Sequence, residues 1–181
     1  MKIVILRIGP IDIDVVGNIQ STLCKVFYGS NCAIIEDVMP IPLDTYNAIR
    51  HQYHSSSVLA KIHDCSKKFG SDRVLGVTDV DLYVPHLNFV FGEAQCPGRN
   101  AIISLCRLKP EFYGQSANKE LFIERSMKEA VHEIGHTLGL RHCHNQACVM
   151  FFSNSILDTD QKRPTFCEKC YPLVIKCLEG V

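Results

Sequence analysis

The sequence predicts one α/β domain built on a mixed, mostly parallel sheet. The chain has 181 residues, little more than one domain at about 150 residues each. Strand-like and helix-like segments alternate through its first half, and several strand-like segments then follow one another. Alternation favours parallel strands joined by helices, whereas consecutive strands favour one antiparallel edge. A composition of 46% hydrophobic and 21% charged residues excludes a disordered chain.

The first elements follow from apolar runs and from the glycines and prolines that end them. Lys2–Ile8 is a β-branched strand candidate that stops at Gly9 and Pro10. Residues 14–27 have helical character, and residues 32–38 form a second strand candidate that ends before Pro40.

The middle of the chain is expected to complete the sheet. Residues 44–68 predict a longer helix, although three consecutive serines at 55–57 could interrupt it. Three further strands are expected, at residues 73–83, 88–93 and 101–108, with a turn at Cys96-Pro97-Gly98.

The second half contains one strongly patterned helix. Asn118 is a good N-cap, and Gly139 is expected to end the helix. One face of this helix is apolar, because hydrophobic residues recur at steps of three and four: Ile123, Met127, Val131, Ile134 and Leu138. The chain then has an irregular pattern up to Cys167, and a short helix is expected at residues 168–178 despite Pro172. We therefore divide the single domain 1–181 into a sheet and helix part, 1–140, and a C-terminal part, 141–181.

The patterned helix carries His132-Glu133-Ile134-Gly135-His136, an H-E-x-x-H motif. Histidines four residues apart project from one helix face, so both imidazoles can bind one zinc ion. Glu133 lies beside them, where it can act as a base on a water without being a ligand. A bare motif of this kind also arises by chance in ordinary helices.

The position of His142 after the motif makes a chance occurrence of H-E-x-x-H improbable. If Gly139 turns the chain out of the helix, His142 can return as a third ligand. Three protein ligands leave one position for water, which separates a catalytic zinc from a structural one. The extended pattern H-E-x-x-H-x-x-G-x-x-H is typical of metzincin metallopeptidases.

Four cysteines form a second constellation, as Cys143-x4-Cys148 and Cys167-x2-Cys170. Two close pairs have the spacing of a four-cysteine structural zinc site. Disulfides or free thiols are the alternative. The other cysteines are scattered and are expected to be free thiols: Cys24, Cys32, Cys65, Cys96, Cys106 and Cys177.

These residues together resemble the archaemetzincin family. The resemblance rests on the run from His132 through His142-Cys143-x4-Cys148-x-Met150, with Cys167-x-x-Cys170 after it. The cysteine directly after the third histidine is its most discriminating feature. Upstream segments also match the family, at residues 76–83, 87–94, 98–100 and 104–105, so that the resemblance covers roughly residues 70–170.

The resemblance implies a compact metzincin-like fold and further roles. Met150 would be the methionine of the Met-turn beneath the three histidines. From the residue alone, packing in the hydrophobic core is an equally good explanation of a methionine. Phe152 stands where several metzincins have a tyrosine ligand, so that ligand is absent. The segment at residues 98–108 is the expected rim strand, against which an extended substrate would pair.

We therefore expect a zinc metallopeptidase with two zinc ions per chain and a peptide or protein substrate. The alternative is a metzincin-fold zinc-binding interaction module with little or no turnover. Nineteen basic and nineteen acidic residues balance, so nucleic acid and membrane are not expected as partners. A cytoplasmic location is expected, because Arg7 interrupts the apolar run at the N-terminus and leaves it too short for a secretory signal. The sequence does not determine the oligomeric state or the natural substrate.

Overall fold

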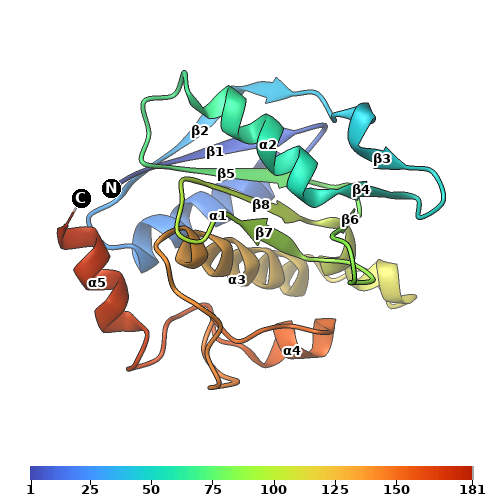
Figure 1. Cartoon of the computed structure of the whole chain (residues 1–181). Helices are drawn as coiled ribbons and strands as arrows, with labels where there is room; N and C mark the ends of the chain where they lie inside the picture. The colour runs from blue at the N-terminus through green and yellow to red at the C-terminus, as the bar shows by residue number, and fades with distance from the viewer. Residues whose placement is uncertain (181) are drawn as a thin grey trace.

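A five-stranded sheet with helices on both faces organises the chain (Figure 1). The computed structural model describes residues 1–180. The strand order is β2-β1-β5-β8-β7, with bounds β1 Lys2–Ile8, β2 Asn31–Met39, β5 Arg73–Thr78, β7 Gly92–Ala94 and β8 Asn100–Ser104. All neighbours are parallel except β7, which is antiparallel to β8. The expected mixed, mostly parallel sheet is confirmed.

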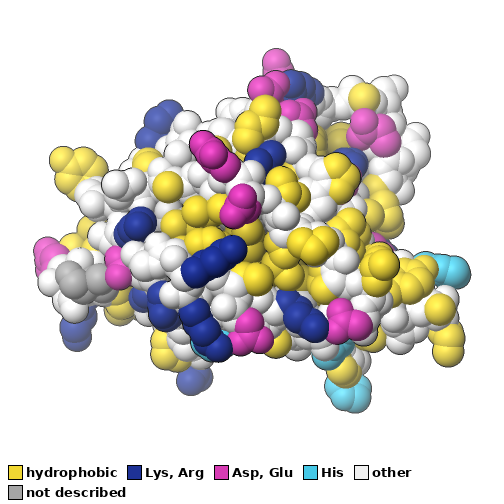
Figure 2. Space-filling model, turned by 90° about the horizontal axis from the view of Figure 1, so that it is seen from above, with side chains coloured by type: hydrophobic (Ala, Val, Ile, Leu, Met, Phe, Trp, Pro, Cys, Tyr) yellow, Lys and Arg dark blue, Asp and Glu magenta, His cyan; other side chains and the backbone are white. Residues whose placement is uncertain are grey.

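The two faces of the sheet bury two separate hydrophobic clusters. In β1, Ile3 and Ile5 face the cluster shared with helices α1 (Ile13–Val26) and α3 (Lys119–Thr137). Val4 and Leu6 face the cluster shared with α2 (Ser55–Ser66). This alternation is the two-residue period of a strand. Hydrophobic side chains remain visible on the α2 side of the molecule (Figure 2).

The expected helix over residues 44–68 is wrong in its first half. Those residues form a 3₁₀ turn (Leu43–Thr45) and the strands β3 (Tyr46–Asn47) and β4 (Gln52–His54). The serines do not interrupt a helix but begin α2. Serine is more favourable at the ends of helices than in their interiors, because its hydroxyl hydrogen-bonds to nearby backbone groups. The expected strand at residues 73–83 is also divided, because β6 (Leu82–Tyr83) pairs with β4 in a second, three-stranded sheet.

The rim of the sheet differs from the expectation. The segment at residues 98–108 does not form an edge, because β8 pairs with β5 on one side and with β7 on the other. It ends in a 3₁₀ turn at Cys106–Leu108. The edge strand is β7, the short remnant of the strand expected at residues 88–93.

The C-terminal half largely follows the sequence pattern. Asn118 caps α3 by accepting a hydrogen bond from the Leu121 amide at 3.0 Å, and Gly139 adopts φ +91° just beyond its end. A helix that was not expected, α4 (Ile156–Gln161), interrupts the irregular segment. The final helix, α5 (Tyr171–Glu179), accommodates Pro172 in its first turn, where no amide donor is needed. None of the described helices has the length and apolarity needed to cross a membrane.

Candidate active site and metal centres

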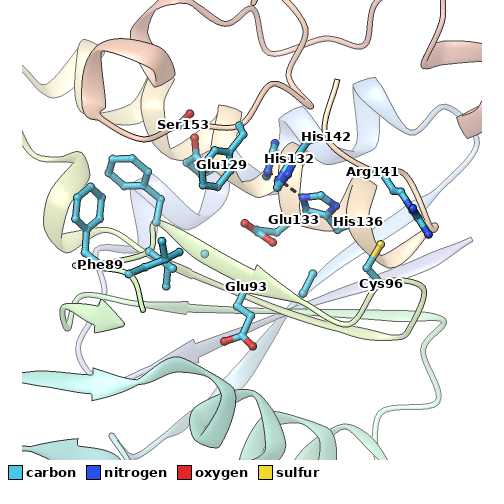
Figure 3. A pocket seen from close by; sticks show the side chains of 16 residues that line it. Phe89, Glu93, Cys96, Glu129, His132, Glu133, His136, Arg141, His142 and Ser153 are labelled. Carbon is cyan, nitrogen blue, oxygen red and sulfur yellow. Dashed lines mark hydrogen bonds between the residues drawn. The ribbon is translucent and has the colours of Figure 1, made fainter. Parts of the chain in front are cut away.

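Helix α3 and the turn after it bring three histidines together. His132 and His136 are one turn apart on α3, and His142 returns to them after the left-handed turn at Gly139. One ring nitrogen from each of the three lies within 4.8 Å of the others. The three imidazoles face a common point beside Glu133 (Figure 3). The structure thus assembles all three histidines that the sequence singled out.

The hydrogen bonds of the rings fix which nitrogen points inward. Nδ1 of His132 donates to the Val149 carbonyl, and Nδ1 of His136 donates to the Leu140 carbonyl, each at 2.7 Å. The proton is therefore on Nδ1, and both Nε2 atoms present lone pairs. Burial lowers the pKa of both rings, which favours this neutral form.

This donor set fits a metal ion. The two Nε2 atoms lie 3.0 Å apart, close to the roughly 3.3 Å that tetrahedral zinc with bonds of 2.0–2.1 Å requires. Two lone pairs at this separation repel unless a cation lies between them. The arrangement can hold zinc through three nitrogens and leave one position open.

Glu133 lies against the sheet edge at the same site and is almost completely buried. A Cβ added to Gly92 would lie only 2.6 Å from the Glu133 side chain, so glycine in β7 makes room for this carboxylate. Burial, and after it the charge of Glu129, raises the pKa of Glu133 well above its usual value. A raised pKa makes the ionised carboxylate a stronger base, which suits proton transfer.

A cavity of about 410 Å³ opens over the histidines, within the size range of small-molecule and substrate sites. The edge strand β7 forms one wall. Figure 3 shows Phe89, Glu129 and Ser153 on one side of the histidines, and Arg141 and Cys96 on the other.

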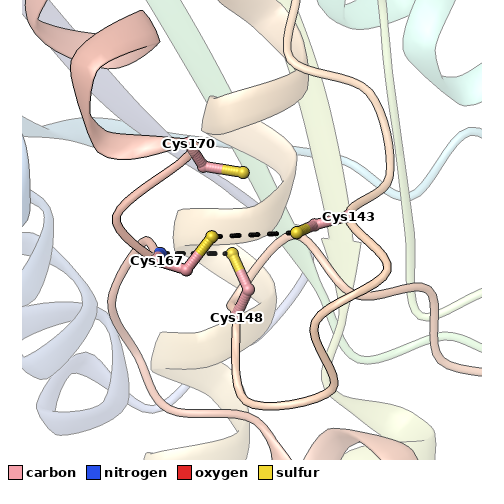
Figure 4. A group of neighbouring side chains, drawn as sticks. All are labelled: Cys143, Cys148, Cys167 and Cys170. Carbon is pink, nitrogen blue, oxygen red and sulfur yellow. Dashed lines mark hydrogen bonds between the residues drawn. The ribbon is translucent and has the colours of Figure 1, made fainter.

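The four predicted cysteines also converge, as Figure 4 shows. Their sulfurs all lie within 4.8 Å of one another, and Cys143 Sγ is 3.8 Å from Cys167 Sγ. A zinc–sulfur bond of about 2.3 Å predicts tetrahedral sulfur separations of about 3.8 Å, far longer than a disulfide. Backbone amides of Asn145 and Cys167 donate to Cys143 Sγ and Cys148 Sγ. Burial raises the pKa of Cys148 and Cys170. Burial acts in the same direction on Cys167, but hydrogen bonds from the amides of Cys170 and Lys169 and from neighbouring thiols together lower its pKa to about 7. The positions of the four sulfurs fit a metal ion, whose positive charge would favour their thiolate forms.

Met150 packs beneath the histidine-bearing helix. It is fully buried, and a Cβ on Gly135 would lie 2.6 Å from its sulfur. Its carbonyl accepts a hydrogen bond from the Cys143 amide at 2.8 Å. The methionine therefore connects the helix with the four-cysteine segment.

A buried ionic network beside the site could not be predicted from motif spacing. Lys162 donates to Glu129 Oε1 at 2.9 Å, and both side chains are almost fully buried. Arg125 makes two hydrogen bonds of 2.7 Å to Asp160. The only available signal was helical spacing, since Glu129 precedes His132 by three residues and shares its face. The network attaches the α4 segment to α3.

The remaining cysteines are free, as expected, in the part of the chain that the structure describes. Cys96 lines the cavity and donates weakly to the Leu140 carbonyl at 3.6 Å.

Comparison with known proteins decides the family. The model of peptidase family M54 matches residues 34–176. The archaemetzincin of Methanocaldococcus jannaschii is 45% identical over 170 residues, which cover 94% of this chain and 90% of that protein. The chain belongs to the archaemetzincin family. It is a zinc metallopeptidase of this family, and the resemblance found in the sequence is confirmed.

Solved archaemetzincin structures share the fold over nearly the whole chain. The Methanopyrus kandleri protein has a TM-score of 0.86 at 35% identity, covering 99% of this chain and 96% of its own. The Archaeoglobus fulgidus protein, complexed with malonate, has a TM-score of 0.80 at 38% identity, covering 96% and 99%.

Proposed function

We propose that this archaemetzincin hydrolyses peptide bonds at a zinc ion held by His132, His136 and His142. The observation that carries the proposal is the convergence of three histidine nitrogens beside the buried Glu133, in the wall of an open cavity. The lone pairs of His132 and His136 face inward, because both rings donate through Nδ1 to backbone carbonyls. Zinc in such a set acts as a Lewis acid and lowers the pKa of its bound water toward about 7.

Glu133 is proposed as the general base. It takes a proton from the attacking water and later gives it to the leaving amine. Its position is set by α3, which carries it, and by Gly92, which faces it. His132 and His136 would act as neutral ligands, because each keeps its proton on Nδ1, from which it donates to a backbone carbonyl.

The substrate is proposed to be an extended peptide. The edge strand β7 lines the cavity opposite the histidines, and its outer side is unpaired within the described residues. A peptide main chain can add to such an edge by backbone hydrogen bonds.

A second zinc ion is proposed at Cys143, Cys148, Cys167 and Cys170, which gives two per chain. Four thiolates complete a tetrahedron and leave no position for water, so this ion would be structural. Its role would be to stabilise the segment that carries His142 and Met150.

The test is zinc-dependent cleavage of a peptide library by the wild-type protein and by Glu133→Ala. We expect the variant to keep its zinc and to lose hydrolysis by about 10²-fold or more, because Glu133 is not a ligand. Glu120→Ala, an exposed carboxylate on the same helix, is the matched control and should retain activity. Full activity of Glu133→Ala would assign the base elsewhere. Absence of cleavage by the zinc-loaded wild type would favour the alternative, a zinc-binding interaction module.

A further inference from the structure

A buried carboxylate that the proposed reaction does not use lines the cavity. Glu129 is only 2% exposed, and its Oε1 accepts from Lys162 Nζ at 2.9 Å and from Thr159 Oγ1 at 3.1 Å. Its Oε2 accepts no hydrogen bond from the described residues. This oxygen is nevertheless not completely enclosed by protein atoms. Because Glu129 is a lining residue, the lone pairs of this oxygen face the cavity.

Ser153 supplies a second acceptor at the same place. Thr159 Oγ1 lies 3.1 Å from both Glu129 Oε1 and Ser153 Oγ, but its hydroxyl has one proton to give. The bond to the carboxylate is charge-assisted and therefore stronger, so Thr159 donates to Glu129 and Ser153 donates to Thr159. The oxygens that Glu129 and Ser153 offer to the cavity are then both acceptors without donors.

The charge of Glu129 is already compensated. Lys162 has a fully buried side chain, and its ammonium donates to Glu129 Oε1 and to the Phe151 carbonyl. Glu129 and Lys162 together carry no net charge, so a cationic substrate group gains little here. A neutral donor such as a hydroxyl, whose single proton can go to either acceptor, therefore suits this place better than a cation.

The walls beside these acceptors are aromatic. Phe89 and Phe91 pack edge to face with ring centroids 5.0 Å apart, and Phe152 also lines the cavity. The Phe89 ring is held in place by the Arg107 guanidinium, which lies 4.3 Å from its centroid and is fixed by Asp81. Figure 3 places Phe89, Glu129 and Ser153 on the same side of the histidines. This arm of the cavity is therefore rigid, apolar along its walls and hydrogen-bonding at one end.

We propose that the arm selects a tyrosine side chain of the substrate, at a residue adjoining the scissile bond. The ring would lie against Phe89, Phe91 and Phe152, and the hydroxyl would donate to Glu129 Oε2 or to Ser153 Oγ. Phenylalanine fills the same space but donates to neither acceptor, so the site loses the hydrogen bond that tyrosine would give, which a polar site penalises strongly. This assignment rests on the proposed function for the position of the scissile bond.

The deciding experiment measures binding rather than turnover. Four peptide hydroxamates that differ only in one side chain (tyrosine, O-methyltyrosine, phenylalanine or lysine) are titrated into the zinc-loaded wild-type protein by calorimetry. We expect the tyrosine compound to bind about 10- to 100-fold more tightly than the phenylalanine compound. O-methyltyrosine keeps the ring and the oxygen but has no proton to donate, so it should bind no better than phenylalanine. Equal affinities for tyrosine and phenylalanine, or tightest binding of a lysine analogue, would overturn the proposal.

Variants locate the effect at the two acceptors. Ser153→Ala should reduce the tyrosine preference, and the volume-conserving double variant Glu129→Met/Lys162→Met should reduce it to about one. The double change avoids leaving a buried lysine unpaired. Asp44→Asn/Lys61→Met, which removes an exposed ion pair outside the cavity, is the matched control and should retain the preference. A preference unchanged in both cavity variants would place recognition elsewhere. If the double variant fails to fold, the ligand series and Ser153→Ala still decide.

Cleavage of tyrosine and phenylalanine peptides separates this proposal from the proposed function. Tight binding of the tyrosine hydroxamate without cleavage of any peptide would contradict hydrolysis and leave the subsite intact. Cleavage with no preference for tyrosine would retain hydrolysis and remove the subsite.

Discussion

The carbonyl oxygen of Val149 lies 2.7 Å from Nδ1 of His132, so a residue next to one of the four clustered cysteines orients one of the three converging histidines. Val149 stands between Cys148 of the four-cysteine cluster and Met150, which packs against Gly135. A second connection is covalent, because His142 directly precedes Cys143. The two candidate metal centres therefore share backbone at two places.

This shared backbone predicts that loss of the structural centre weakens the catalytic one. Cys170→Ser should lower zinc affinity at the histidines about 10- to 100-fold, the usual effect of losing an outer-shell partner, although Cys170 does not touch that ion. His132→Ala should leave zinc at the cysteines, since that tetrahedron needs no histidine. The measurement is titration of each variant with a competing chelator.

The control for this experiment is Cys65→Ser, a cysteine of α2 outside both metal groups. It should leave both affinities unchanged. Wild-type affinity at the histidines in a folded Cys170→Ser protein would contradict the coupling.

Metal analysis should find close to two zinc ions per chain in protein purified without chelator. Two candidate ligand sets are present. The Nε2 atoms of His132 and His136 lie 3.0 Å apart and the sulfurs of Cys143 and Cys167 lie 3.8 Å apart, both close to the separations in tetrahedral zinc sites. The four clustered cysteines should resist alkylation in the native state and become reactive after chelation. A reproducible content of one zinc, with all four cysteines reactive beforehand, would exclude the structural ion.

Gly135→Ala should destabilise the protein by about 1–3 kcal/mol, the usual cost of overpacking. The new methyl group would lie 2.6 Å from the Met150 sulfur, which is buried and has little room to move. Gly17→Ala in α1 is the matched control, since nothing lies within 4 Å of its added Cβ. It should stabilise the helix by about 0.5–1 kcal/mol. Urea unfolding checks both, and equal effects would show that the Met150 contact is unimportant.

Lys162→Met should destabilise the protein by about 3–5 kcal/mol, because it leaves the buried Glu129 carboxylate unpaired. The double variant Glu129→Met/Lys162→Met should recover most of this loss. Lys61→Met breaks an exposed pair with Asp44 and should cost at most about 1 kcal/mol. Thermal unfolding of the three variants measures these differences. A single variant no less stable than the double one would argue against a buried charged pair.

Helix α3 and its candidate metal ligands could be predicted because the residues that define them lie close together in the sequence. Cap, apolar period and terminal glycine define α3, and the H-E-x-x-H spacing places two ligands on one face of it. The cysteine cluster was predictable for a related reason, since close pairs of thiols have few other roles in one domain. The parallel order of β1, β2 and β5 followed from their alternation with helices.

Other features could not be predicted, because they depend on contacts between residues that are far apart in the sequence. The pattern of residues 98–108 does not reveal that β7 covers its outer side, so the edge was assigned to the wrong strand. Lys162 lies in a polar stretch of the sequence, which does not indicate that its side chain is buried. Its burial results from the position of α4, which places Lys162 against Glu129. A lysine and a glutamate separated by 33 residues carry no local signal of pairing.

The shortness of β7 would also limit which conformations of a protein could be cleaved by the proposed strand pairing. Its three residues, Gly92–Ala94, offer an edge only about 10 Å long at 3.3 Å per residue. A chain that pairs there must already be extended and must expose its own backbone donors and acceptors. Residues inside the helices and sheets of a native protein have those groups occupied. By the proposed pairing, cutting would begin at termini, flexible loops and locally unfolded segments, and the folding stability of a target protein would govern how fast it is degraded.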